Sequence, residues 1–230
     1  MISLTLPSIH EGALRRTLDN INQTTRNFVE VVVVAPFQFE YKLRNGKVVW
    51  IKETTPLGCN GGHEIAAKFA TQKFIAPWVD DHLFINGWDF IILWGFTLPQ
   101  LGPLSVGLRH AIEPHVGTVF GKYYPYFPVM RLDDIKNIGW FSGEYKRGFA
   151  DCDLAMRVWD AGGACVPSDI GVVLKHPDDA RKMGDLMEGE AHCLPEDMAL
   201  FLSRWGEKYG EGYDLSSLRG FNQDIVPGFQ

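Results

Sequence analysis

The feature that most constrains the fold is a run of β-branched residues near the start of the chain. Residues 28–35, FVEVVVVA, are almost continuously apolar, and the run stops at Pro36. A strand of this kind is covered on both faces, which is typical of a parallel sheet with helices on either side. A strand pattern at residues 2–7 and a helical pattern over residues 11–25 precede it. The opening of the chain is therefore predicted to form a β-α-β unit.

The same alternation continues to residue 79. A strand pattern over residues 47–52 is followed by a glycine-rich turn at 58–62, a helical pattern over 64–73 and an apolar strand pattern over 74–79. Beyond residue 100 the chain becomes rich in Gly, Pro and aromatic residues, which favours an antiparallel segment forming one wall of a cleft. We therefore expect an α/β fold with a mostly parallel central sheet flanked by helices, together with a small antiparallel segment.

The last part of the chain returns to regular patterns. A helical pattern covers residues 151–161 and ends at two glycines, and a short strand pattern covers residues 171–175. Phe201 and Trp205 then stand at helical spacing in a region rich in acidic residues and glycine, which indicates a helical tail packed on the domain.

Composition excludes several classes of protein. With 46% hydrophobic and 22% charged residues, the chain is typical of globular proteins and is not collagenous or disordered. Its 28 acidic and 22 basic residues give a net charge of −6, so no overall positive field would gather a nucleic acid. Its four cysteines contain no C-x-x-C spacing, which favours reduced thiols and a cytoplasmic protein; they are Cys59, Cys152, Cys165 and Cys193.

We expect no integral membrane segment. The amino-terminal residues lack the pattern of a signal peptide, and the apolar stretch over 83–98 is interrupted by Asn86, Gly87 and Asp89. Peripheral membrane contact through Trp88 and Trp94 stays open at this point.

Three groups of polar residues are candidates for chemistry. Asp80, Asp81 and His82 follow an apolar strand, where carboxylates and an imidazole suit a divalent cation, although adjacent acids are also common in turns. His176 follows a later strand and is either a further ligand or an ordinary loop residue. Asp151 and Asp153 begin a helix, where an acid acts as a general base or as a helix cap.

In their order along the chain, these segments resemble the family 2-type glycosyltransferases of the GT-A (Rossmann-like) fold over most of residues 2–205. The resemblance is carried by TLPSIHEGALRRTLDNINQTT, by CNGGHEIAAKFATQKFIAPWVDDH, by GFADCDLAMRVWDAGG and by His176. Two positions depart from the family pattern. Ala35-Pro36-Phe37 stands where an acid usually contacts the nucleotide base, and Ala150 stands where a Glu usually precedes the acidic Asp151.

The resemblance implies a single domain over residues 1–230. Residues 1–97 would bind the nucleotide sugar, residues 98–183 would form the acceptor side, and residues 184–230 would be a helical tail. The activity implied is that of a metal-dependent, inverting glycosyltransferase, transferring a hexose or a pentose from a nucleoside diphosphate donor to an acceptor hydroxyl.

Residue roles follow from the same resemblance. Asp80, His82 and His176 would hold Mn²⁺ or Mg²⁺, and Asp151, or as second choice Asp153, would be the catalytic base. The donor would be contacted by residues of the first strand end, the second signature and the acidic group: Pro7, Ser8, His10, Glu11, Asn60, Asp80 and Asp81. The acceptor stays open, as a glycan, a lipid, a protein or a modified base, because the aromatic residues on its side suit stacking and core packing equally; these are Tyr123, Tyr124, Tyr126, Trp140 and Phe141.

Two other functions compete. A non-catalytic nucleotide-sugar or glycan binding module would share this fold and is favoured by the missing acids near residues 35 and 150. A sugar-nucleotide pyrophosphorylase is disfavoured, because the chain has no early Gly-rich motif followed by Arg and Lys to cradle a triphosphate.

Overall fold

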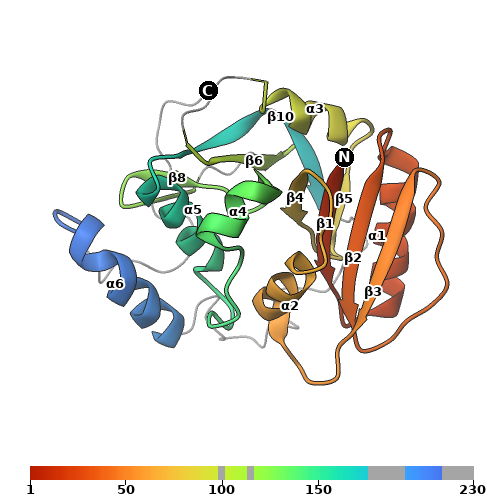
Figure 1. Cartoon of the computed structure of the whole chain (residues 1–230), viewed down its shortest axis with the longest axis horizontal. Helices are drawn as coiled ribbons and strands as arrows, with labels where there is room; N and C mark the ends of the chain where they lie inside the picture. The colour runs from red at the N-terminus through yellow and green to blue at the C-terminus, as the bar shows by residue number, and fades with distance from the viewer. Residues whose placement is uncertain (98–101, 113–116, 176–194, 214–230) are drawn as a thin grey trace.

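The computed structural model describes residues 1–97, 102–112, 117–175 and 195–213. Its main feature is an eight-stranded sheet in the order β3-β2-β1-β4-β9-β6-β10-β5, with a separate two-stranded sheet of β7 and β8 (Figure 1). The strands are β1 (Ile2–Pro7), β2 (Val29–Ala35), β3 (Gly46–Lys52), β4 (Phe74–Pro77), β5 (His82–Phe84), β6 (Leu104–His110), β7 (Gly117–Val119), β8 (Lys122–Tyr124), β9 (Pro128–Arg131) and β10 (Ala164–Lys175). The helices are α1 (Glu11–Thr24), α2 (Gly58–Ala67), α3 (Trp88–Trp94), α4 (Leu132–Ile138), α5 (Ala150–Asp160) and α6 (Pro195–Tyr209).

Strands β1 to β4 form the parallel part of the large sheet. β1 pairs in parallel with both β2 and β4, and β2 pairs in parallel with β3. The β6–β10 pair is parallel as well, whereas β9 and β5 join the sheet through antiparallel pairs. The mostly parallel α/β fold predicted from the sequence is therefore confirmed, and the carboxyl ends of β1 to β4 lie at one edge.

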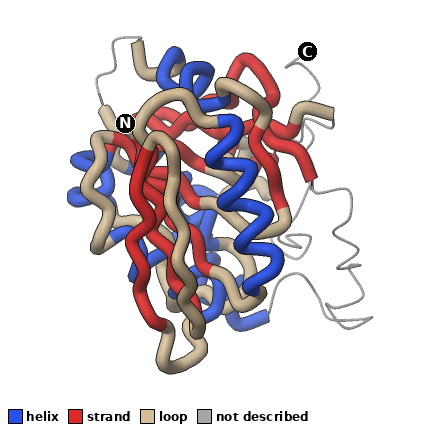
Figure 2. Tube along the Cα trace, turned by 90° about the vertical axis from the view of Figure 1, so that its right-hand side faces the viewer, coloured by secondary structure: helices blue, strands red, loops and turns tan. Residues whose placement is uncertain are grey.

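Helices cover both faces of this parallel part, and α1 lies along one of them (Figure 2). Every residue of β2 is buried, as its β-branched run predicts. Its side chains alternate between the two faces. Val31 and Val33 pack in the same cluster as Leu14 of α1, whereas Val32 and Val34 pack with Ala66 of α2.

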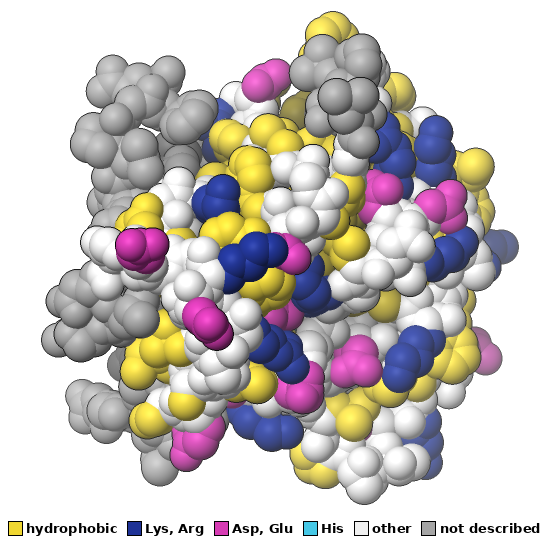
Figure 3. Space-filling model, turned by 60° about the vertical axis from the view of Figure 1, so that its left-hand side comes forward, with side chains coloured by type: hydrophobic (Ala, Val, Ile, Leu, Met, Phe, Trp, Pro, Cys, Tyr) yellow, Lys and Arg dark blue, Asp and Glu magenta, His cyan; other side chains and the backbone are white. Residues whose placement is uncertain are grey.

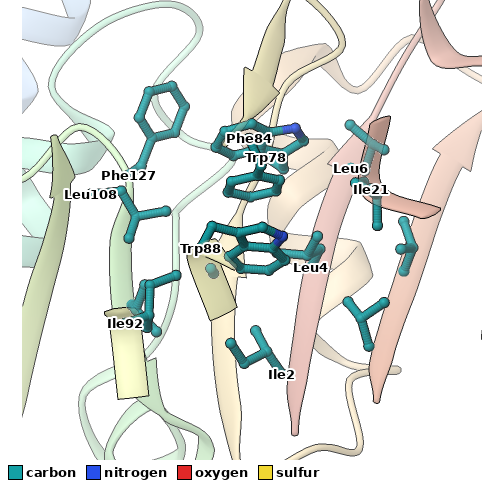
Figure 4. Packing of buried hydrophobic residues seen from close by; sticks show 14 of the residues in the cluster. Ile2, Leu4, Leu6, Ile21, Trp78, Phe84, Trp88, Ile92, Leu108 and Phe127 are labelled. Carbon is teal, nitrogen blue, oxygen red and sulfur yellow. The ribbon is translucent and has the colours of Figure 1, made fainter. Parts of the chain in front are cut away.

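The centre of the larger core is a stack of aromatic rings from three consecutive elements (Figure 4). Trp78 lies 3.5 Å from Phe84, and Phe84 lies 3.7 Å from Trp88, measured between ring centroids. Trp88 is fully buried and so is not placed to contact a membrane, whereas Trp94 is 71% exposed. Trp88 and Ile92, four residues apart in α3, both face this core.

The antiparallel segment predicted beyond residue 100 is confirmed. β9 pairs antiparallel with β4 and with β6, and β7 pairs with β8 as a small separate sheet. A second core cluster lies under these strands and includes Tyr124, Trp140, Phe149 and Phe201.

Two predicted elements have the wrong bounds. The glycine-rich segment 58–62, predicted to be a turn, is the first part of α2, and the helix ends at Ala67 instead of continuing to residue 73. Glycine is required there by close packing: a Cβ on Gly62 would lie 2.6 Å from the Cβ of Pro7. The strand predicted at residues 171–175 is the end of the twelve-residue β10, which carries register shifts between Pro167 and Val173 that break its alternation.

No disulfide joins the cysteines at positions 59, 152 and 165, which are the ones that the structure describes. Among the described helices, none has the length and apolar character needed to cross a membrane.

Candidate active site

A cavity of about 620 Å³ lies at the carboxyl edge of the parallel strands. Its walls come from the residues that follow β1, β2, β3 and β4 and from the start of α2. This is the edge at which open α/β sheets bind ligands. We call it the donor cavity; it is lined by Pro7, Ser8, Ile9, His10, Pro36, Glu53, Thr54, Thr55, Pro56, Gly58, Cys59, Val79, Asp80 and Asp81.

Ser8 and Asp80 join the ends of the two central strands across this cavity. The Ser8 hydroxyl donates a hydrogen bond to the Asp80 carboxylate, and the His10 backbone N–H donates to Ser8 Oγ at 3.2 Å. The Ser8 backbone N–H donates to the carbonyl of Val34 at 3.0 Å, which fixes the turn to the neighbouring strand. The structure therefore brings Ser8 and Asp80, predicted from separate segments, into direct contact.

Asp81 and His82 are the next pair along the same loop. Asp81 Oδ1 lies 2.6 Å from His82 Nδ1, and the Asp81 side chain is 46% exposed. The third ligand predicted for a metal, His176, lies outside the described residues. Among the residues that the structure describes, no group of three or more His, Cys, Asp or Glu side chains is arranged to hold a metal ion.

Not every predicted donor contact faces the cavity. His10, at the N-cap position of α1, lines it, but Glu11 is absent from its walls and forms an ion pair of 2.7 Å with Arg15 on the surface of α1. Glu53 also lines the cavity but was not predicted from the sequence as a site residue. Its position directly after β3 is the signal that could have identified it, because other lining residues also directly follow strands. Its Oε1 accepts a hydrogen bond from the Leu57 backbone N–H at 2.8 Å, so the carboxylate is fixed at the cavity wall.

A second, smaller cavity of about 130 Å³ adjoins the first. Cys59 and Val79 line both cavities, so the two share a wall. We call the smaller one the acceptor cavity; its lining residues are Cys59, Asn60, His63, Pro77, Val79, Tyr126, Phe127, Phe141, Arg147, Gly148, Ala150 and Asp151.

Asp151 is the ionisable carboxylate of the acceptor cavity. It lies in the first turn of α5, where its Oδ1 accepts a hydrogen bond of 2.9 Å from the Cys152 backbone N–H. It is not the helix cap, because the N-cap residue is Phe149. Desolvation by the surrounding protein raises the pKa of Asp151 to about 6, against the lowering effect of the backbone hydrogen bonds. A carboxylate with this pKa is ionised at neutral pH and can accept a proton.

Asp153, the second candidate base, lies in a different environment. Its side chain is 1% exposed and is absent from the walls of both cavities. It accepts hydrogen bonds from the Tyr145 hydroxyl at 3.0 Å, from Trp205 Nε1 at 2.9 Å and from Arg157 Nε at 2.9 Å. Its Oδ1 thus joins α5 to the preceding loop and to α6, and its Oδ2 binds Arg157 of the same helix.

Asn60 lines the acceptor cavity rather than the donor cavity. Its Nδ2 donates a hydrogen bond of 3.0 Å to the carbonyl of Tyr145, so its amide holds the loop that precedes α5. This hydrogen bond joins the two halves of the chain, and the nucleotide contact predicted for Asn60 stays a prediction.

Two further side chains of the acceptor cavity carry titratable groups, His63 and Cys59. Burial lowers the pKa of His63 to about 3, so its ring is neutral, and its Nδ1 lies 2.8 Å from Thr5 Oγ1. Desolvation, followed by the negative charges of Asp80 and Asp81, raises the pKa of the Cys59 thiol to about 12. Neither group is ionised near neutral pH, so the charged side chains that line the acceptor cavity are Asp151 and Arg147.

The aromatic residues on the acceptor side divide between core and cavity. Tyr124 and Trp140 are buried in the second core cluster. Tyr126 and Phe141 line the acceptor cavity, and Tyr123 is half-buried beside α5, where its carbonyl accepts a hydrogen bond from Trp159 Nε1 at 3.0 Å.

The surface gives no sign of a nucleic-acid interface on the face shown in Figure 3, where Lys and Arg lie interspersed with Asp and Glu and form no extended basic area. This mixture agrees with the net charge of −6.

The sheet order and the cleft at its carboxyl edge define the class: the chain has the GT-A fold of nucleotide-sugar glycosyltransferases, as its motifs predicted. Among solved structures, it is similar to a mannosyltransferase from Pyrobaculum calidifontis in complex with GDP-Man and Mn²⁺, with a TM-score of 0.64 and 17% identity over 88% of this chain. It is also similar to GalNAc-T7 with UDP, GalNAc and Mn²⁺, with a TM-score of 0.64 and 12% identity over 91% of this chain. For S. aureus TarS in complex with UDP, the TM-score is 0.55 and the identity 17% over 75% of this chain.

The chain matches only part of each of these proteins: 64% of the mannosyltransferase, 50% of GalNAc-T7 and 59% of TarS. No protein-family model and no curated protein sequence matches it. The similarity therefore shows the fold, and the activity is a matter for proposal.

Proposed function

We propose that this chain is a metal-dependent, inverting glycosyltransferase that moves a hexose or pentose from a nucleoside diphosphate donor to an acceptor hydroxyl. The observation that carries the proposal is the pair of cavities with a common wall, one at the carboxyl edge of β1 to β4 and one containing Asp151. A two-substrate transfer needs such an arrangement, because donor and acceptor must meet with their reacting atoms adjacent.

The donor cavity suits a nucleoside diphosphate. Its volume of about 620 Å³ is within the range of small-molecule sites. Apolar side chains from Ile9, Pro36 and Pro56 provide surface for a base and a ribose, and Ser8 and Asp80 provide polar groups for the diphosphate side. Glu53 lines the donor cavity and is the acid placed to contact the nucleotide base. Ala35 stands where the family usually carries an acid for that contact.

Asp80 and Asp81 fit a hard divalent cation, because both line the cavity and present oxygen donors at its edge. His82, which is joined to Asp81, and His176 complete the proposed ligand set for Mn²⁺ or Mg²⁺. A cation bound there supplies positive charge that stabilises the departing nucleoside diphosphate. Ser8 keeps the Asp80 carboxylate turned toward the cavity.

Asp151 is the proposed base. It takes the proton of the acceptor hydroxyl, whose oxygen forms a bond to the anomeric carbon while the bond from that carbon to the diphosphate breaks. The leaving diphosphate keeps the electron pair of the broken bond. In a single displacement of this kind, the acceptor oxygen attacks the anomeric carbon from the face opposite the leaving group, which inverts the anomeric configuration. We propose Asp151 in preference to Asp153 because Asp153 is buried and accepts hydrogen bonds from Tyr145, Arg157 and Trp205.

The experiment has two arms. A panel of nucleotide sugars is screened by thermal shift with Mn²⁺, and the donor that stabilises the protein most is then assayed for release of nucleoside diphosphate. We expect turnover that EDTA stops and Mn²⁺ restores, and we expect Asp151→Asn to abolish it while the donor still binds.

Each alternative gives a different outcome. Donor binding without any release of nucleoside diphosphate would identify a nucleotide-sugar binding module. Undiminished turnover in Asp151→Asn would reject Asp151 as the base, and turnover in excess EDTA would reject the metal assignment.

A further inference from the structure

The loop of residues 142–148, which we call the bridging loop, leads directly into the helix that carries Asp151. Arg147 and Gly148 of this loop line the acceptor cavity. The bridging loop contains no helix or strand, so its shape depends on groups that bind its backbone from outside.

Asp197, in the first turn of α6, binds three consecutive backbone N–H groups of the bridging loop. Its Oδ1 accepts from Lys146 at 2.8 Å, and its Oδ2 accepts from Arg147 at 2.8 Å and from Gly148 at 3.0 Å. The side chain is 1% exposed. A buried carboxylate that accepts several backbone hydrogen bonds fixes those backbone groups strongly, because hydrogen bonds to a charged group are stronger than those between neutral groups.

The same helix holds the residue that follows the loop. Phe149 has a φ of 62°, a left-handed conformation that is strained for a bulky side chain. Its ring stacks on Phe201 of α6 at 4.9 Å, with an interplanar angle of 20°. Phe120, the other described non-glycine residue with a positive φ, also stacks on Phe201, at 5.7 Å. α6 therefore supports both strained backbone positions on this side of the cleft.

From the opposite side, α2 completes the support. Asn60 Nδ2 donates to the carbonyl of Tyr145 at 3.0 Å, and Glu64 Oε2 accepts from the Gly143 backbone N–H at 2.8 Å. The bridging loop is thus held between α2, which also forms part of the donor cavity, and α6, which does not.

We propose that Asp197 is a positioning residue, which sets the place of the Asp151 carboxylate by fixing the backbone of residues 146–148 from α6. This inference rests on the proposed function and extends it to a helix that touches neither cavity. Asp197 lines neither cavity, and it binds the backbone of Arg147 and Gly148, which do line the acceptor cavity, so it acts through the loop. A displacement of about 1 Å in a catalytic group is enough to lower a rate about a hundredfold.

The test compares Asp197→Asn with Asp89→Asn. Asp89 is a matched control, because it is also buried, at 2% exposed, and also accepts backbone N–H groups, from Arg26 and Asn27, at the far side of the sheet from the cleft. Both variants should lose stability by similar amounts. We expect only Asp197→Asn to lower kcat for donor turnover, by about tenfold to a hundredfold, while the KM for the donor stays within about twofold.

A second readout does not depend on activity. Amide hydrogen exchange should become faster in residues 142–151 of Asp197→Asn and stay unchanged there in Asp89→Asn. If Asp197→Asn does not fold, Arg204→Lys replaces it, because Arg204 binds Glu144 and the Tyr145 hydroxyl from the same helix and is partly exposed.

The outcomes separate this inference from the proposed function. Equal kcat and equal loop exchange in the Asp197 and Asp89 variants would overturn the positioning role. If the wild type turned over no donor, the proposed function would fail, and the exchange measurement would still decide whether Asp197 fixes the loop.

Discussion

Asp151→Asn should make the protein more stable at pH 8. The pKa of Asp151 is raised in the folded protein from 3.8 to about 6, because the surrounding protein desolvates the carboxylate. An acid with a raised pKa binds protons more tightly in the folded state, so its ionisation above pH 6 opposes folding. The shift is about 2 units, and each unit corresponds to about 1.4 kcal/mol, so the penalty at pH 8 is up to about 3 kcal/mol.

Asparagine removes the charge and keeps the side-chain shape, and its Oδ1 can still accept the hydrogen bond from the Cys152 N–H. The gain should shrink as the pH falls from 6 and disappear below about pH 4, where the carboxyl group is protonated in both the folded and the unfolded state. Equilibrium unfolding in urea at pH 8 and pH 4 measures both values.

The matched control is Asp133→Asn. Asp133 lies on the surface of α4, where the ammonium group of Lys136 lowers its pKa, so the neutral variant should not be more stable at pH 8. If Asp151→Asn were no more stable than the wild type at pH 8, or differed from it equally at both pH values, the conclusion that desolvation raises the pKa of Asp151 would be refuted.

Three other predictions follow from the same geometry. The rate of donor turnover should rise with pH through an acid limb near pH 6, the pKa of Asp151, and a limb near pH 4 in a kcat–pH profile would contradict this. Ser8→Ala, which removes the hydrogen bond to Asp80, should weaken binding of nucleoside diphosphate with Mn²⁺ by about tenfold in calorimetry, and unchanged affinity would count against the site. Trp78→Ala should lower the free energy of unfolding by about 3–5 kcal/mol, because it removes a fully buried ring that stacks on Phe84 and leaves a cavity in the core; a loss below 1 kcal/mol in urea unfolding would show that the stack is not a rigid core.

The first third of the fold was predictable because its pattern is local. The β-branched run of β2 and the single apolar face of α1 each identify their element without reference to the rest of the chain. The start of α2 was not predictable, because Gly62 is required there by the close approach of Pro7, which is far away in the sequence. Glycine in a sequence indicates a turn far more often than a tightly packed helix.

The candidate site divides in the same way. Asp80 and Asp151 could be found because each follows or begins a recognisable element, and the structure places each at a cavity wall. Asp153 has an equally good position in the sequence, at the start of the same helix, but it is turned into the interior. Only the packing of α6 against α5 distinguishes it from Asp151, and that contact joins segments about fifty residues apart, as in the hydrogen bond from Trp205 to Asp153.

The most direct test of the account is a crystal structure of the protein with Mn²⁺ and the nucleoside diphosphate of its preferred donor. We expect anomalous density for Mn²⁺ beside Asp80, the diphosphate in the donor cavity next to Ser8, and the Asp151 carboxylate facing it across the shared wall. A nucleotide bound elsewhere on the molecule, or Mn²⁺ remote from Asp80, would contradict the central claim that this cleft is where the sugar is transferred.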